Sequence, residues 1–385
     1  MELPENVRRD FRSIRDALAR DNHDVRLVGG SVRDLVMETA PKDYDFATTA
    51  PPERVMKTFS NYALNFEAHP TGIQHGTVTV VIRGTPYEVT TLRVDKKTDG
   101  RRAEVEFTDD WQADAARRDF TINAMYMDLD GRIYDYYNGR QDLARREVRF
   151  VGDPVDRIRE DYLRILRFFR FHSLIGNANV LPVIEDAIVK NAEGLKGISG
   201  ERIWSELTKT LSGPNRYWAL KWMNQTRVTD HIGLPTPVEG MFYVSEAKNS
   251  SWIAALAALI RDVKTLEVCR NRWKFDNASY GILRYVIENR RERTSVDWAK
   301  AAIVNGVNPT HLYHLAVFVG DWETAEYAKS SPPIPKFPVN GNDIKAIGMS
   351  GKAIGESLDF LRDIWVKSGY NMDKTELMSK LVVAL

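Results

Sequence analysis

A change in the hydrophobic pattern near residue 150 limits the possible folds of this 385-residue chain more than any other feature. Before that point, short apolar and β-branched runs alternate with helical segments and with glycine or proline turns. Beyond Asp153 the strand pattern is lost and apolar residues recur at helical spacing. A chain of this length also exceeds a single compact core. The pattern therefore predicts an α+β domain followed by an all-helical remainder.

Individual elements follow from the same pattern. In the first part of the chain we expect strands at 26–29, 44–47, 77–82 and 87–92, a helix at 31–38, and a helix opened by Pro51 and Pro52. Residues 93–111 are polar and charged, which predicts a long loop or a flexible hairpin. Farther along we expect helices at 158–174, 200–211, 217–223 and 251–266, and a proline-rich break at 331–335.

Composition excludes several classes of protein. The chain has one cysteine, Cys269, so an internal disulfide and a thiolate metal site are both excluded. No apolar run approaches 18 residues, and the first residues lack the pattern of a signal peptide, so we expect a cytoplasmic protein without a membrane span. The net charge of +1 is not that of a strongly basic nucleic-acid-binding domain, although basic residues can still cluster locally.

A double glycine joins the first expected strand to the first expected helix. The segment reads Leu27-Val28-Gly29-Gly30-Ser31-Val32-Arg33-Asp34. Gly29 and Gly30 permit close approach of the backbone, and free amides at a helix start attract phosphate. Ser31 can cap the helix and offer its hydroxyl to a phosphate, and Arg33 lies one turn farther on. The segment is neither a Rossmann nor a P-loop sequence, and a plain tight turn is the alternative interpretation.

A pair of carboxylates follows the glycine turn. Asp43 and Asp45 are two residues apart, a spacing that places both side chains on one face of a strand. Neighbouring carboxylates repel one another unless a cation lies between them, and Mg²⁺ prefers oxygen ligands from carboxylates and substrate phosphates. Glu88 on a later strand is the candidate for a third catalytic carboxylate. A solvated loop for the pair and an outward-facing strand position for Glu88 are the alternatives.

Five segments resemble the motifs of class II tRNA nucleotidyltransferases and follow one another in the family's order. That family belongs to the DNA polymerase beta-like superfamily and includes the bacterial poly(A) polymerases. The glycine turn and the Asp43–Asp45 pair resemble the start of the family's head domain. The later matches are Arg117-Arg118-Asp119-Phe120-Thr121-Ile122-Asn123-Ala124 (motif B), Asp135-Tyr136-Tyr137-Asn138-Gly139-Arg140-Gln141-Asp142-Leu143 (motif C), Glu160-Asp161-Tyr162-Leu163-Arg164 (motif D) and Gly200-Glu201-Arg202-Ile203-Trp204-Ser205-Glu206-Leu207 (motif E).

The resemblance implies a fold with four parts. It predicts a polymerase-beta-like nucleotidyltransferase head with a mixed sheet and helices at 1–145, and a helical neck that selects the base at 146–211. A helical body at 212–300 and a helical tail at 301–385 would bind tRNA. Basic and aromatic clusters at 216–222, 270–274 and 290–293 are candidates for following the acceptor stem and T arm, although core aromatics and solvated charges explain them equally well.

The resemblance also gives roles to residues outside the glycine turn. Arg117 and Arg118 would neutralise the triphosphate, with pairing to Asp114 or Asp119 as the alternative. Asn123 would lie near the nucleotide sugar. Asp161 and Arg164 would hydrogen-bond the base edge, with Glu160 supporting Arg164 through a salt bridge. Two further arginines on the same helical face, Arg167 and Arg170, would lie toward phosphate, and motif E would brace motif D.

The predicted activity is addition of CCA to the 3′ end of tRNA from CTP and ATP, with Mg²⁺ as cofactor and no required protein partner. A poly(A) polymerase usually carries a Gly-basic-basic-Phe segment and a basic C-terminal extension, and neither is present here. An enzyme that adds only CC tends to have a short loop after the Glu88 strand, whereas 93–110 is long. Addition of only the final A stays open. A catalytically dead RNA-binding module would be expected to lack Asp43 or Asp45.

Overall fold

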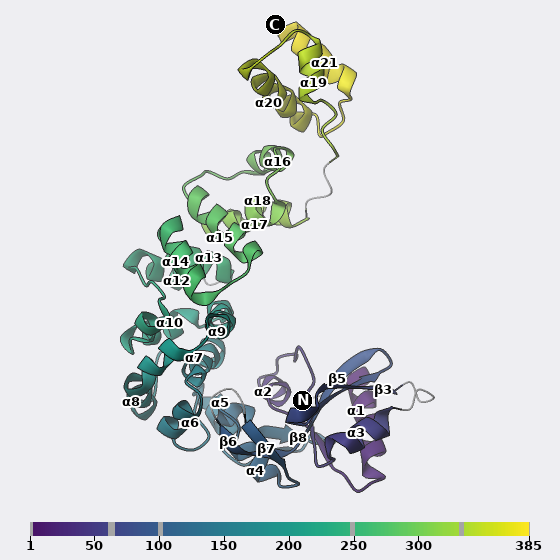
Figure 1. Cartoon of the computed structure of the whole chain (residues 1–385), viewed down its shortest axis with the longest axis vertical. Helices are drawn as coiled ribbons and strands as arrows, with labels where there is room; N and C mark the ends of the chain where they lie inside the picture. The colour runs from purple at the N-terminus through teal and green to yellow at the C-terminus, as the bar shows by residue number, and fades with distance from the viewer. Residues whose placement is uncertain (1–2, 61–65, 99–102, 247–250, 331–334, 385) are drawn as a thin grey trace. The chain divides into compact units, whose positions relative to one another are not determined.

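The computed structural model describes residues 3–60, 66–98, 103–246, 251–330 and 335–384. The chain divides into two compact units, Met1–Gly233 and Leu234–Leu385 (Figure 1). Within the described ranges, all strands lie in the first unit and the second unit is helical. This arrangement confirms the predicted α+β head followed by helices. No helix in the described part of the chain is long and apolar enough to cross a membrane.

A seven-stranded mixed sheet forms the centre of the head. Its strands are β1 (Val25–Val28), β2 (Phe46–Thr48), β3 (Phe66–Gly72), β4 (Thr77–Ile82), β5 (Thr85–Thr91), β8 (Met125–Met127) and β9 (Ile133–Asp135). Their order across the sheet is β3-β4-β5-β2-β1-β8-β9. Only β2 and β5 pair in parallel; the other neighbours are antiparallel. The four expected strands correspond to β1, β2, β4 and β5, while β3, β8 and β9 were not predicted.

Short helices pack around this sheet. They are α1 (Glu5–Ala19), α2 (Gly30–Val36), α3 (Pro52–Phe59), α4 (Trp111–Ala116) and α5 (Gly139–Arg145). α1 buries Phe11 against Phe46 of β2, with the ring centroids 4.8 Å apart. α3 begins at Pro52 as expected, because proline has no amide hydrogen to leave unpaired in the first turn.

A separate two-stranded hairpin lies between β5 and α4 in the sequence. Its strands are β6 (Arg93–Thr98) and β7 (Ala103–Phe107), paired antiparallel. Of the two predictions for this segment, the structure confirms the hairpin. Residues 99–102, which include Asp99-Gly100, lie outside the described residues.

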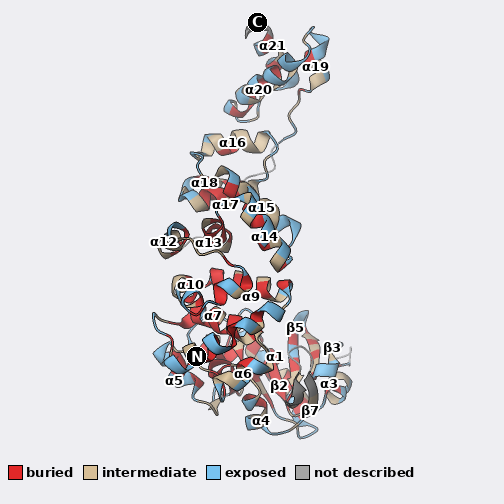
Figure 2. Cartoon of the chain, turned by 60° about the vertical axis from the view of Figure 1, so that its left-hand side comes forward, coloured by how far each residue is buried: buried red, intermediate tan, exposed pale blue. Residues whose placement is uncertain are grey.

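The rest of the first unit is helical. Its helices are α6 (Pro154–Glu160), α7 (Leu163–Ile175), α8 (Pro182–Asn191), α9 (Gly200–Ser212), α10 (Arg216–Gln225) and α11 (Val228–Ile232). α7 packs against α9 and α10, and Figure 2 shows buried residues along these three helices. The helices expected at 200–211 and 217–223 are confirmed as α9 and α10.

Two of the expected helices are each broken by an aspartate. The segment 158–174 divides between α6 and α7 because Asp161 adopts an extended conformation (φ −157°, ψ 108°) and accepts a hydrogen bond from the Leu163 amide. The segment 251–266 divides between α13 and α14, where Asp262 caps the second helix. A short acidic side chain satisfies the first amides of a new helix, which hydrophobic periodicity does not reveal.

The second unit contains ten helices within its described residues. They are α12 (Val238–Glu246), α13 (Trp252–Leu259), α14 (Val263–Trp273), α15 (Asn277–Asn289), α16 (Val296–Val304), α17 (Pro309–Val319), α18 (Trp322–Ser330), α19 (Gly341–Ala346), α20 (Lys352–Lys367) and α21 (Lys374–Ala384). The last three helices share a small core around Trp365. Most of the predicted proline-rich break, 331–334, lies outside the described residues.

Candidate active site

The glycine turn lies beside two guanidinium groups. Gly29 has a φ of 68° and α2 begins at Gly30, so a non-glycine residue would be strained at position 29. A Cβ added at Gly29 would lie 3.4 Å from Arg118 Nη1, and one added at Gly30 would lie 3.6 Å from Arg33 Nη2. The turn therefore brings the backbone close to two guanidinium groups, an arrangement that suits a phosphate chain.

Ser31 fastens this turn to the carboxylate segment. Its hydroxyl donates to the Asp43 carbonyl oxygen at 3.2 Å and accepts from the Asp45 amide at 3.0 Å. The predicted capping role of Ser31 is wrong, because Gly29 occupies the N-cap position and Ser31 already lies inside α2. The side chain instead fixes the distance between the glycine turn and the paired aspartates.

Asp43 and Asp45 precede β2 rather than lying on it. The strand expected at 44–47 begins at Phe46, although the Asp45 carbonyl still accepts from the Val28 amide at 3.0 Å. In the parallel pairing of β2 with β5, Phe46 is opposite Val89. The residues immediately before them, Asp45 and Glu88, are therefore neighbours at this edge. This places the third candidate carboxylate beside the pair.

The carboxylates at this end of β2 and β5 repel one another. The pKa of Asp45 is raised to about 6, chiefly by burial and further by the negative charges of Glu88 and Asp43, while Arg118 acts in the opposite direction. A cation between the carboxylates would relieve this repulsion. Within the described ranges, no group of three or more Asp, Glu, His or Cys side chains could hold a metal by itself. Two carboxylates are a donor set that fits Mg²⁺ when substrate phosphates supply the remaining ligands.

Asp114 organises the two arginines of motif B. Its carboxylate pairs with Arg117 Nη2 at 2.7 Å and with Arg118 Nη2 at 3.1 Å, and it accepts from the Tyr126 hydroxyl at 2.7 Å. Burial alone would raise the pKa of Asp114, but the two arginines and the Tyr126 hydrogen bond lower it to about 2. Of the predicted alternatives, pairing with Asp114 is therefore observed, and Arg118 also faces the glycine turn.

A chain of polar contacts runs from the glycine turn to α7. Arg33 Nη1 donates to the Asn123 amide oxygen at 2.8 Å, and Asn123 Nδ2 donates to Asp119 at 3.4 Å. Asp119 then accepts from Arg167 Nε at 2.6 Å. Burial raises the pKa of Asp119, but the positive charge and hydrogen bond of Arg167 outweigh it and the pKa is lowered. Three predicted nucleotide-binding residues thus belong to one network.

The two residues expected to read the base are each held by a protein partner. Asp161 Oδ2 accepts from Arg202 Nη2 at 2.6 Å. Arg164 Nη1 donates to the Glu160 carboxylate and, at 2.9 Å, to the Arg157 carbonyl oxygen. The expected Glu160–Arg164 salt bridge is confirmed, even though the helix is broken between them.

Arg170 adjoins this network at the Phe171 ring, because Arg33 and Arg167 lie over the same ring, at 5.2 and 5.6 Å from its centroid. Its guanidinium is 3.4 Å from Glu206 and lies 5.0 Å from the Phe171 ring centroid.

Sequence reasoning gave no role to Arg157 or to Asp114 as an organising carboxylate. Asp114 was predicted only as an alternative partner of Arg117 and Arg118, although it precedes them by three and four residues, the spacing of helical ion pairs. The contacts of Arg157 with the Arg117 and Arg118 carbonyl oxygens join segments about 40 residues apart and have no comparable sequence pattern.

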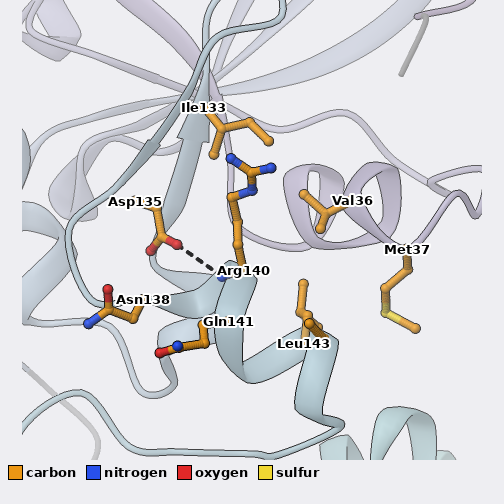
Figure 3. Close-up of a pocket in the computed structure, with 9 residues that line it drawn as sticks. Val36, Met37, Ile133, Asp135, Asn138, Arg140, Gln141 and Leu143 are labelled. Carbon is orange, nitrogen blue, oxygen red and sulfur yellow. Dashed lines mark hydrogen bonds between the residues drawn. The ribbon is translucent and has the colours of Figure 1, made fainter.

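A pocket of about 780 Å³ lies elsewhere in the head. It is lined by the end of α2, by β9 and by α5, and therefore by much of motif C (Figure 3). Asp135 accepts from the Arg140 amide at 2.9 Å at its edge. No predicted site residue lines this pocket.

Comparisons with known proteins agree with this architecture. The Poly A polymerase head domain matches residues 25–149, and the probable RNA and SrmB-binding site of polymerase A matches residues 179–235. The CCA tRNA nucleotidyltransferase 1, mitochondrial, of Mus musculus is 38% identical over 393 residues, which cover 96% of this chain and 89% of the relative. The chain belongs to the tRNA nucleotidyltransferase/poly(A) polymerase family.

Further relatives of this nucleotidyltransferase are bacterial. The CCA-adding enzyme of Bacillus cereus (strain Q1) is 34% identical over 294 residues, covering 74% of this chain and 72% of the relative. The crystal structure of the Bacillus stearothermophilus CCA-adding enzyme in complex with CTP has a TM-score of 0.77 at 28% identity. That match covers 99% of this chain and 98% of the other. The family membership suggested by the motifs is confirmed.

Proposed function

We propose that this nucleotidyltransferase adds CCA to the 3′ end of tRNA from CTP and ATP, without a nucleic-acid template. The observation that carries the proposal is the half-buried Asp45, placed between Asp43, Glu88 and Arg118 beside the glycine turn. This combination suits nucleotidyl transfer, which needs cation-binding carboxylates next to a triphosphate cradle. The CCA-adding relatives from mouse and Bacillus cereus support the choice of tRNA as substrate.

The head residues bind and orient the triphosphate in this proposal. Gly29, Gly30 and Ser31 form the cradle, and Arg33, Arg117 and Arg118 supply positive charge. Asp43 and Asp45 would hold Mg²⁺, with Glu88 beside them; a bound Mg²⁺ lowers the pKa of the tRNA 3′-hydroxyl and neutralises phosphate charge. The 3′ oxygen forms a bond to the α-phosphorus, the α–β phosphoanhydride bond breaks, and pyrophosphate leaves.

The neck residues choose the base. Asp161 accepts a hydrogen bond from an exocyclic amine, and Arg164 donates to a ring nitrogen or carbonyl. Cytosine and adenine both present an amine on this edge, whereas uracil and guanine do not offer the same pattern. Arg202 and Glu160 already orient the two side chains, which supports a preorganised recognition site. Asn123 lies near the sugar, and Arg167 and Arg170 lie toward phosphate.

The helices beyond the neck bind tRNA. The proposal includes a neck at 146–211, a body at 212–300 and a tail at 301–385. Arg216 is excluded as a direct contact, because it is buried and donates to the Leu211 carbonyl oxygen. A cytoplasmic location is also proposed, while the mouse relative carries a mitochondrial name.

Incorporation of each labelled nucleotide into three tRNA transcripts tests the proposal. The transcripts end before CCA, after C, and after CC. We expect CTP to extend the first two and ATP to extend only the third, with no further addition. Long A tracts would replace the proposal with a poly(A) polymerase. Arrest after CC, or activity on the third transcript alone, would indicate a partial enzyme, and no extension at all would indicate an RNA-binding module.

A further inference from the structure

Arg157 of α6 joins two parts of the candidate site. Its Nη2 donates to the carbonyl oxygens of Arg117, at 2.5 Å, and Arg118, at 2.8 Å. Its Nη1 donates to Glu160 Oε2 at 2.6 Å. One guanidinium therefore holds the backbone that carries the motif B arginines and the carboxylate that pairs with Arg164. Its planar fork reaches acceptors that a single ammonium group cannot reach together.

This arrangement carries an electrostatic cost. Arg157 and Arg164 share the carboxylate of Glu160, and only 11% and 13% of their side chains are exposed. Burial lowers the pKa of Arg157, and the neighbouring charge of Arg164 lowers it too. Its Nε has no hydrogen-bond partner among the residues that the structure describes. Burying two cations around one carboxylate costs more free energy than supporting a helix requires. The arrangement therefore favours a role for Arg157 in the geometry of the site.

We propose that Arg157 is a positioning residue that fixes the distance between the triphosphate-binding arginines of motif B and the base-reading Arg164. This inference rests on the proposed function, because it assumes that one nucleotide spans both parts. The nucleotide is held at its phosphates and at its base, so an error in the separation of the two ends moves the base against Asp161 and Arg164. Arg157 thus contributes to the choice of base without touching it.

The test measures discrimination as well as rate. The full-length Arg157→Met variant is compared with wild type for kcat and KM of CTP, and of UTP in place of CTP, on a tRNA transcript that ends before CCA. We expect kcat/KM for CTP to fall about 30-fold and the preference for CTP over UTP to fall about tenfold, since small misplacements cost up to about 100-fold. Arg157→Lys should recover rate more than discrimination, because an ammonium cannot bridge all three acceptors.

Arg159→Met is the matched control on the same helix. Arg159 is exposed and contacts only the Asn191 amide oxygen among the bonds of its side chain described here, at 3.3 Å, so its loss should leave the CTP preference unchanged. If Arg157→Met is poorly folded by circular dichroism, Arg157→Lys provides the measurement, since it keeps the charge and loses the fork that bridges the three acceptors. A lower rate with wild-type discrimination in the folded variant overturns the inference. A wild-type chain that extends no tRNA overturns the proposed function instead.

Discussion

At the scale of single residues, the account depends on Asp45. Its raised pKa results from burial and from the charges of Glu88 and Asp43, an arrangement that suits cation binding but opposes folding of the metal-free chain. In Asp45→Asn we expect turnover to fall by at least about 100-fold, because a charged group at the reacting phosphates is lost. Asp130→Asn, in an exposed turn, is the control and should keep wild-type turnover. Wild-type turnover in Asp45→Asn would contradict the assignment.

The same substitution should stabilise the metal-free chain at neutral pH. The folded-state pKa of Asp45, about 6, lies above its ordinary value of 3.8, so ionisation opposes folding more and more as pH rises from 3.8 to 6. Asp45→Asn lacks this cost. We expect its free energy of unfolding at pH 7.5 with chelator to exceed that of wild type by about 1 kcal/mol, after allowance for solvent screening. The difference should vanish near pH 4; urea titrations at both pH values measure it.

Asp114 should show the opposite pH dependence. Its folded-state pKa is lowered from 3.8 to about 2, so its contribution to stability is present above pH 3.8 and is lost as pH falls through 2. Asp114→Asn leaves Arg117 and Arg118 without a buried partner charge and should cost about 3 kcal/mol at pH 7. Urea unfolding should show this gap from wild type narrowing between pH 4 and pH 2.5. A gap that is constant with pH would refute the ionic explanation.

Residue types were easier to predict than residue partners. The carboxylates, the glycines and the basic residues of motifs B and D follow from local sequence. The bonds of Ser31 to the Asp43–Asp45 segment do not, because they form only when β1 and β2 are paired in the sheet. The pairing of Asp161 with Arg202 likewise depends on how α9 packs against α7.

At the scale of elements, the hairpin of β6 and β7 packs against Gly76. Gly76 has a φ of 83°, and a Cβ there would lie 2.8 Å from Phe107 Cε1 in β7. Arg93, which pairs with Phe107 at the same end of the hairpin, donates to the His75 carbonyl oxygen, and its own carbonyl accepts from Arg117 Nε at 3.1 Å. The hairpin is therefore attached both to the sheet and to motif B.

Gly76→Ala should displace Phe107. Because enzymes that add only CC tend to have a short segment after the Glu88 strand, we expect this change to impair the addition of A more than the addition of C. We expect kcat/KM for ATP on a transcript ending in CC to fall about tenfold, and that for CTP on the shorter transcripts to fall less. Gly84→Ala is a matched control, because Gly84 has a φ of 81° but no atom within 4 Å of an added Cβ. Equal losses in the two variants would show that backbone strain alone is responsible, and that the seating of the hairpin has no role.

Element boundaries were predictable only where hydrophobic periodicity sets them. β4 was predicted residue for residue, since every residue along it is β-branched. The division of 158–174 was missed because a side chain, Asp161, ends one helix and starts the next. That break is functional in this account, since it places a base-reading carboxylate between the two helices.

At the scale of the whole molecule, catalysis and most tRNA binding are assigned to different compact units. All predicted site residues lie in Met1–Gly233. A chain ending at Gly233 should keep its affinity for CTP within a few-fold, because its binding site is intact. Its Kd for tRNA should rise by at least about tenfold, since phosphate contacts from the second unit are lost. Filter binding and calorimetry measure the two constants; an unchanged Kd for tRNA would refute the assignment of tRNA binding to the second unit.

The most direct test of the central claim is the 3′-terminal sequence that the enzyme writes when all four nucleotides are available. Wild-type chain, Mg²⁺ and a tRNA transcript ending before CCA would be incubated together, and the product termini read by mass spectrometry. The account predicts a single product ending in CCA, and no extension by Asp45→Asn. Products that contain U or G, or that continue beyond the terminal A, would contradict it.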